Sequence, residues 1–174
     1  MHLQIGSLKY QNSTEEEFEK MLFFAVDHLN KGSTLIQSEE TKMHLSNLNL
    51  RAGQKAIKSS AYGPAAEYLK AGIRLLCDDD WEDNSDGHWE NEYQLSLQFF
   101  TSLIECLYCI GSLDQIEKHV NKIFQHARCF ADKKRAHRCL IKCLTGMGKL
   151  EEAIDVGFEG LTQIGETFPS SAST

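Results

Sequence analysis

The sequence has few prolines, no long hydrophobic run and no excess of positive charge. Only 2 of its 174 residues are proline, which favours uninterrupted helices. The longest apolar run, residues 21–26, ends at Asp27 and is far too short for a membrane-spanning helix. Lysine and arginine number 18 against 25 aspartates and glutamates, so the formal net charge is −7. This balance argues against sequence-independent binding to nucleic acid, which needs a basic surface.

The first residues also lack the basic and apolar regions of a secretory signal, so we expect a cytoplasmic protein. In a reducing compartment cysteines remain free thiols rather than forming disulfides. The chain has six of them: Cys77, Cys106, Cys109, Cys129, Cys139 and Cys143. Apolar residues account for 41% of the sequence and charged residues for 25%, which are ordinary values for a folded globular chain.

Apolar residues recur at helical spacing along most of the chain, and no strand-like alternation is found. Residues 12–17 offer capping oxygens followed by acids, which predicts a helix start, and Gly32 predicts its end. The acidic segment 78–87 is predicted to be a loop and the tail 170–174 to be disordered. The further helices are predicted from Ser38 to about residue 62, from Pro64 to about Leu76, and over 89–110, 113–130, 132–147 and 150–164. The fold class is therefore all-α.

An internal repeat refines this prediction. Residues 103–113 and 140–150 are identical at six of eleven positions, at an offset of 37 residues. A period of this length, built from helix, glycine turn and helix, is typical of tetratricopeptide-like helical hairpins, which stack into an α-solenoid. We therefore predict a tetratricopeptide-like α-solenoid.

Several linked segments resemble one multidomain family. They include residues 28–32, 48–56 and 59–62, with Trp89 and Tyr93 further along the chain. The segments are similar to the helical region that follows the AAA-type ATPase module in large signalling kinases. The resemblance implies a segment lying between an ATPase module and GAF or histidine-kinase regions.

This resemblance sets the expected domain organisation. Residues 1–12 would be a remnant of the end of an ATPase module, and residues 13–62 an N-terminal helical pair. Residues 63–164 would form tetratricopeptide-like repeats that include the acidic loop 78–87, and residues 165–174 a disordered tail.

The catalytic motifs of that family are absent from this sequence. No phosphate loop of the form G-x-x-x-x-G-K-[ST] occurs, and neither do the kinase motifs H-R-D and D-F-G. His119, His126 and His137 are not placed beside a serine or carboxylate by any motif. We therefore expect no catalytic residues, no cofactor and no enzymatic activity.

Two clusters remain as candidate sites. Lys133, Lys134 and Arg135 form the one basic cluster of an acidic chain. Such a cluster is usually a solvated face, and the alternative, which makes it our candidate site, is contact with an acidic protein partner. Cys106 and Cys109 have the spacing of a zinc knuckle, but the repeat places Gly146 where a second knuckle would need a cysteine. Cys106 and Cys143 occupy equivalent positions of the repeat, and we expect both to be core thiols rather than metal ligands.

Taken together, the sequence predicts a non-catalytic segment that docks or couples modules of an ATPase-linked signalling kinase. Its partner would be an ATPase or kinase module of the same or a related polypeptide, with no binding to nucleic acid or membrane. One alternative is a standalone adaptor, a decayed paralogue or gene fragment, that binds another protein. A metal-binding regulator is the second alternative.

Overall fold

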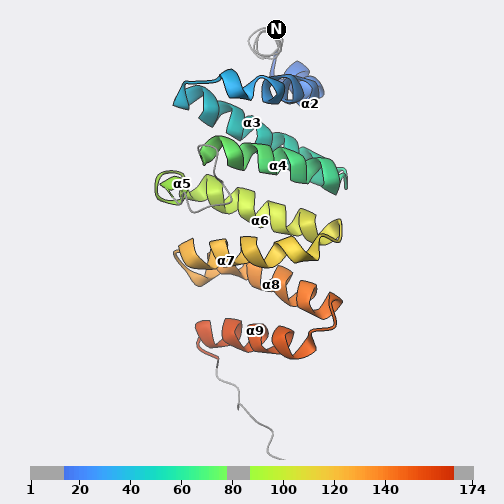
Figure 1. Cartoon of the computed structure of the whole chain (residues 1–174), viewed down its shortest axis with the longest axis vertical. Helices are drawn as coiled ribbons and strands as arrows, with labels where there is room; N and C mark the ends of the chain where they lie inside the picture. The colour runs from blue at the N-terminus through green and yellow to red at the C-terminus, as the bar shows by residue number, and fades with distance from the viewer. Residues whose placement is uncertain (1–13, 78–86, 167–174) are drawn as a thin grey trace, which may run out of the picture. The chain divides into compact units, whose positions relative to one another are not determined.

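The structure, a computed structural model, describes residues 14–77 and 87–166 (Figure 1). Within these two stretches every regular element is a helix, which agrees with the predicted all-α class. None of these helices combines the length and the apolarity needed to span a membrane. The described residues divide into two compact units, and the division falls within helix α6, between Leu103 and Ile104.

The first described helix of the first unit is α2 (Glu15–Lys31), whose start is fixed by local hydrogen bonds. The Thr14 hydroxyl accepts from the Glu17 amide, and the Glu17 carboxylate accepts from the Thr14 amide at 3.0 Å. This capping box satisfies amides that have no partner within the helix. Gly32 caps the other end, as the sequence predicts, and a short 3₁₀ turn, η1 (Ser33–Leu35), follows.

Helices α3 (Glu39–Lys58) and α4 (Tyr62–Leu76) pack closely against each other in the same unit. Ser38 caps α3, as predicted. At the crossing, Gly53 lies so near Leu69 that an added Cβ would be 2.9 Å from its side chain. The division that the sequence predicts after residue 62 falls at the start of α4, and α3 and α4 both belong to the first unit. Helices α2 and α3 also pack together around an apolar core: Leu22, Ala25, Val26, Leu29, Leu45, Leu48 and Ala52.

The helix predicted over 89–110 is two helices, α5 (Gly87–Asn91) and α6 (Tyr93–Cys109). The chain bends at Glu92, and His88 then contacts Ser96 through its ring Nδ1 and its carbonyl oxygen, at 2.8 and 3.2 Å. Trp89 and Phe100 pack beside His88 and are buried. The bend thus turns the first residues of the predicted helix toward a buried aromatic cluster.

The second unit contains the end of α6, a 3₁₀ turn η2 (Leu113–Gln115), and α7 (Ile116–His126), α8 (Phe130–Gly146) and α9 (Leu150–Gln163). Helix α7 packs on α8, and α8 packs on α9. The helix predicted from residue 113 to 130 is shorter than expected, because η2 replaces its first turn and the chain leaves helical geometry at Ala127.

Three predictions lie outside the described residues. They are the ATPase remnant at residues 1–12, nearly all of the acidic loop 78–87, and the tail beyond Glu166. Gly87, the last residue of the predicted loop, is the first residue of α5.

Candidate protein-docking surface

The basic cluster predicted from the sequence lies in the first half of α8. Lys134 and Arg135 are exposed, and Lys133 is half-buried. The three side chains have different surroundings, because α8 presents its successive residues in different directions. The cluster is therefore not a uniform cationic patch.

Arg135 is held by Glu105, a residue of α6. Its Nε donates to one carboxylate oxygen at 3.0 Å and its Nη2 to the other at 2.6 Å, a bidentate arrangement. Arg138 adds a second guanidinium 3.5 Å from the same carboxylate. The hydrogen bond to Glu105 raises the pKa of Arg135 above its ordinary value. Much of the Arg135 charge is thus balanced within the protein, whereas Lys134 is exposed on the neighbouring position of α8.

Lys133 lies over an aromatic cluster instead. Its ammonium is 5.9 Å from the centre of the Phe124 ring, within the range of a cation–π contact. Phe124 in turn lies 4.4 Å from the ring of His137, centre to centre. The half-buried Lys133 therefore directs its ammonium toward Phe124, beside the buried His137.

That buried site is centred on His137, whose side chain is 5% exposed. Phe124 and Phe130 flank its ring, and an added Cβ at Gly160 of α9 would lie 3.5 Å from its Nδ1. Neither ring nitrogen has a hydrogen-bond partner among the described residues. Burial lowers the pKa of His137, and the positive charge of Lys133 lowers it further, whereas Glu159 opposes this effect. His137 therefore packs between α7, α8 and α9, where burial disfavours its protonated form.

The knuckle cysteines are placed differently from one another. Cys106 is buried, and burial raises the pKa of its thiol to about 12, whereas Cys109 is exposed. Cys139 is also buried, with a pKa raised to about 11 by burial, and its thiol donates to the Ile104 carbonyl at 3.4 Å. Across the part of the chain that the structure describes, no three histidine, cysteine or acidic side chains gather into a metal-binding group.

A second surface, on α9, was not singled out from the sequence. Leu150, Ile154 and Phe158 are 58%, 55% and 45% exposed, and they recur at intervals of four residues. This spacing places them on one side of the helix. We call these three residues the α9 stripe. The repeat could have revealed the α9 stripe. Its 37-residue offset aligns Ile154 and Phe158 with the polar residues Glu117 and Asn121, so two apolar residues stand where the preceding repeat has polar ones.

Comparison with known proteins gives one informative similarity. The chain is 22% identical over 145 residues to the hybrid signal transduction histidine kinase G of Dictyostelium discoideum. The aligned region covers 83% of this chain but only 4% of that much longer protein. No established family and no solved structure matches the chain. The similarity supports an association with signalling kinases, which the sequence analysis predicted.

Proposed function

We propose that this chain is a non-catalytic helical segment that docks or couples modules of a signalling kinase through protein–protein contacts. The observation that carries the proposal is the extent of the similarity to the hybrid histidine kinase. It runs through most of this chain and a very small part of the kinase, which suits a connecting segment. The sequence contains no phosphate loop and no kinase motif that would suggest phosphoryl transfer by these residues.

The proposal includes a tetratricopeptide-like arrangement of the helices, which would provide extended surfaces for other polypeptides. Two equivalent turns support it. Gly111 and Gly148, separated by the repeat offset of 37 residues, have φ angles of 78° and 77°. The residue after each glycine donates to the carbonyl five residues earlier, at 3.0 Å from Ser112 and 2.9 Å from Lys149. Helices α6 and α8 thus end in the same Schellman motif.

The basic cluster is the first contact that we propose with an ATPase or kinase module. Lys134 is exposed, whereas Lys133 and Arg135 also contact Phe124 and Glu105. Charge reversal at Lys134 therefore tests docking with little effect on the fold. Reversal at Arg135 would place a carboxylate against Glu105 and would mix a loss of stability with a loss of binding.

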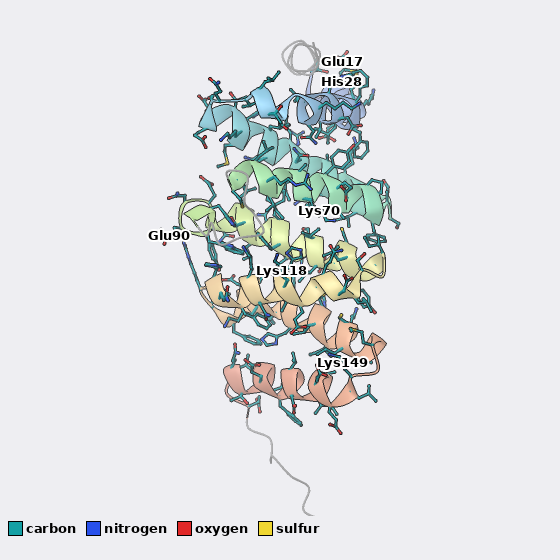
Figure 2. All side chains as sticks on the ribbon, in the orientation of Figure 1. Glu17, His28, Lys70, Glu90, Lys118 and Lys149 are labelled. Carbon is teal, nitrogen blue, oxygen red and sulfur yellow. The ribbon has the colours of Figure 1, made fainter. Side chains whose placement is uncertain are left out.

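The test is calorimetric titration of this chain with the separately purified histidine-kinase and ATPase modules of the hybrid kinase or of a paralogous polypeptide. We expect binding to one module, weakened about threefold or more by Lys134→Glu and less sensitive to salt in that variant. Lys118→Glu, an exposed lysine of α7 labelled in Figure 2, is the matched control and should bind as the wild type does.

Two results would count against the proposal. One is the absence of binding to every module tested. The other is ATP hydrolysis by the purified chain that is lost on substitution of one of its own residues.

A further inference from the structure

The α9 stripe lies outside the buried positions of its own helix. Helix α9 packs on α8 through a different set of positions, at which Ala153 and Gly160 are buried. The exposed apolar side continues past the end of the helix to Ile164, which is 54% exposed. Single exposed apolar residues are common on protein surfaces, whereas several on one side of a helix form an apolar patch, and larger patches of this kind occur at interaction sites.

The repeat provides an internal comparison for this surface. Glu117 and Asn121 of α7, which align with Ile154 and Phe158, are exposed and polar. Helix α7 therefore packs on α8 without any apolar residue at these positions. At the same time α9 has Ala153 where α7 has the fully buried Ile116. Compared with α7, α9 thus has a smaller residue at this buried position and apolar residues at the two exposed positions.

The charges on α9 indicate which partner would fit. Residues 150–163 include four acidic residues, Glu151, Glu152, Asp155 and Glu159, and no lysine or arginine. Glu151 and Asp155 follow Leu150 and Ile154 by one residue each, so on the helix they border the stripe. Glu152 forms an ion pair with Lys149, whose Nζ is 3.2 Å from a carboxylate oxygen of Glu152. Lys149 lies at the turn between α8 and α9 and is labelled in Figure 2. The border of the stripe is therefore negative.

This negative border argues against two other occupants. A second copy docked stripe to stripe would bring the acidic borders of both copies together, and like charges at an interface cost binding free energy. Helices that lie on anionic membranes carry lysine and arginine beside their apolar face, which is the opposite charge pattern. A protein helix with basic residues beside its apolar seam satisfies both the stripe and its border.

We propose that the α9 stripe is the docking face for an amphipathic helix of a partner polypeptide whose apolar seam is bordered by lysine and arginine. The inference rests on the proposed function in protein docking and assigns it a second surface, distinct from the basic cluster on α8. Helix α9 has 14 residues and is about 21 Å long, so a partner helix of about four turns would cover it.

The experiment uses fluorescence anisotropy with three labelled synthetic peptides of about 18 residues. The first has leucine at heptad positions a and d and lysine at e and g. The second has glutamate in place of lysine, and the third has the composition of the first with its leucines spread around the helix. We expect the full chain to bind the first peptide at least tenfold more tightly than either of the others.

The variant Leu150→Gln/Ile154→Glu then tests the stripe directly. We expect it to weaken binding of the first peptide at least tenfold, although it makes the chain more negative and would strengthen a purely electrostatic attraction. Leu35→Gln, which removes a 74% exposed leucine elsewhere, is the matched control and should change nothing. Should circular dichroism show that the double variant is unfolded, Ile154→Ser replaces it in the same comparison.

Several outcomes would overturn the inference. They are equal binding of the first peptide by wild type and variant, equal binding of the first and third peptides, a wild-type dimer in sedimentation that the variant abolishes, and stripe-dependent binding to phosphatidylserine vesicles. The kinase modules distinguish this inference from the proposed function. Binding of a module that Ile154→Ser leaves unchanged contradicts the α9 assignment alone, whereas binding of no module contradicts the proposed function.

Discussion

The side-chain amides of Asn30 and Asn49 form two reciprocal hydrogen bonds, each 2.8 Å long, between α2 and α3. Asn49 is completely buried, and its amide also donates to the Leu45 carbonyl at 3.0 Å. The pair therefore joins the two helices and provides partners for the buried Asn49 amide. Such pairs also fix the register of the two helices, because a shift along either one would separate the amides.

Replacing Asn49 with leucine should destabilise the protein. The substitution keeps the size of the side chain but leaves the Asn30 amide without its partner, at a cost of about 1–3 kcal/mol in the free energy of unfolding. Urea denaturation measures this cost. Asn47→Ala is the control, because Asn47 is exposed and donates to the Met43 carbonyl of its own helix. It should change stability by less than about 0.5 kcal/mol. Equal effects of the two substitutions would contradict the role assigned to the amide pair.

Ser60→Gly should stabilise the protein. Ser60 has a φ angle of 58°, and the residues around it make the same Schellman hydrogen bonds as the glycine turns, with Ala61 donating to the Ala56 carbonyl at 2.9 Å. A side chain in this region of φ is strained, so glycine should gain roughly 0.5–1 kcal/mol in thermal or urea unfolding.

The reciprocal change supplies the control. Gly148→Ser introduces the same strain at a φ of 77°, where nothing lies within 4 Å of an added Cβ, and should lose a similar amount. A stabilising effect of Gly148→Ser would show that backbone strain does not decide these turns.

Ile116→Ala should cost about 2–5 kcal/mol, because Ile116 is fully buried at the start of α7 and its truncation leaves a cavity. Ile154→Ala removes the same atoms from a side chain that is 55% exposed, so it should change the free energy of unfolding by less than about 1 kcal/mol. Chemical denaturation of both variants tests the burial difference directly. A small effect at Ile116 would mean that the packing of α7 described above is wrong.

Stability should fall as the pH drops below about 6.5, partly because of His137. Burial lowers the pKa of this histidine in the folded state, so the unfolded chain takes up its proton at a higher pH. As the pH falls from the pKa of the unfolded chain to that of the folded protein, protonation of His137 therefore favours the unfolded state progressively. Above about pH 6.5 the histidine is unprotonated in both states and this destabilisation is absent. Urea unfolding at pH 8, 7, 6 and 5 measures it.

The control for this prediction is His137→Phe, which keeps a ring between Phe124 and Phe130 but cannot titrate. The variant should lose less stability than the wild type on acidification. Parallel loss in both proteins would assign the pH dependence to other groups.

The sequence alone determined the features that depend on neighbouring residues. The capping box of Thr14 and Glu17 and the glycine turns at 111 and 148 involve atoms within three to five residues of one another, so their signals are local. The all-α class follows from the same local periodicity. The bend at Glu92 was missed because the apolar spacing continues across it, and only the contact of His88 with Ser96 and the aromatic cluster distinguishes the two helices.

Only the tertiary structure decided what the candidate surfaces are. Arg135 is bound by Glu105, 30 residues earlier, and this distant carboxylate separates Arg135 from the otherwise similar Lys134. His137 packs against Phe124, Phe130 and Gly160, and this burial disfavours its protonated form. Ile116 and Ile154 are chemically identical, yet one is enclosed by packed helices and the other faces solvent. The sequence identifies a residue as apolar and predicts its helix, but only the packing of distant segments decides whether the side chain is buried or exposed.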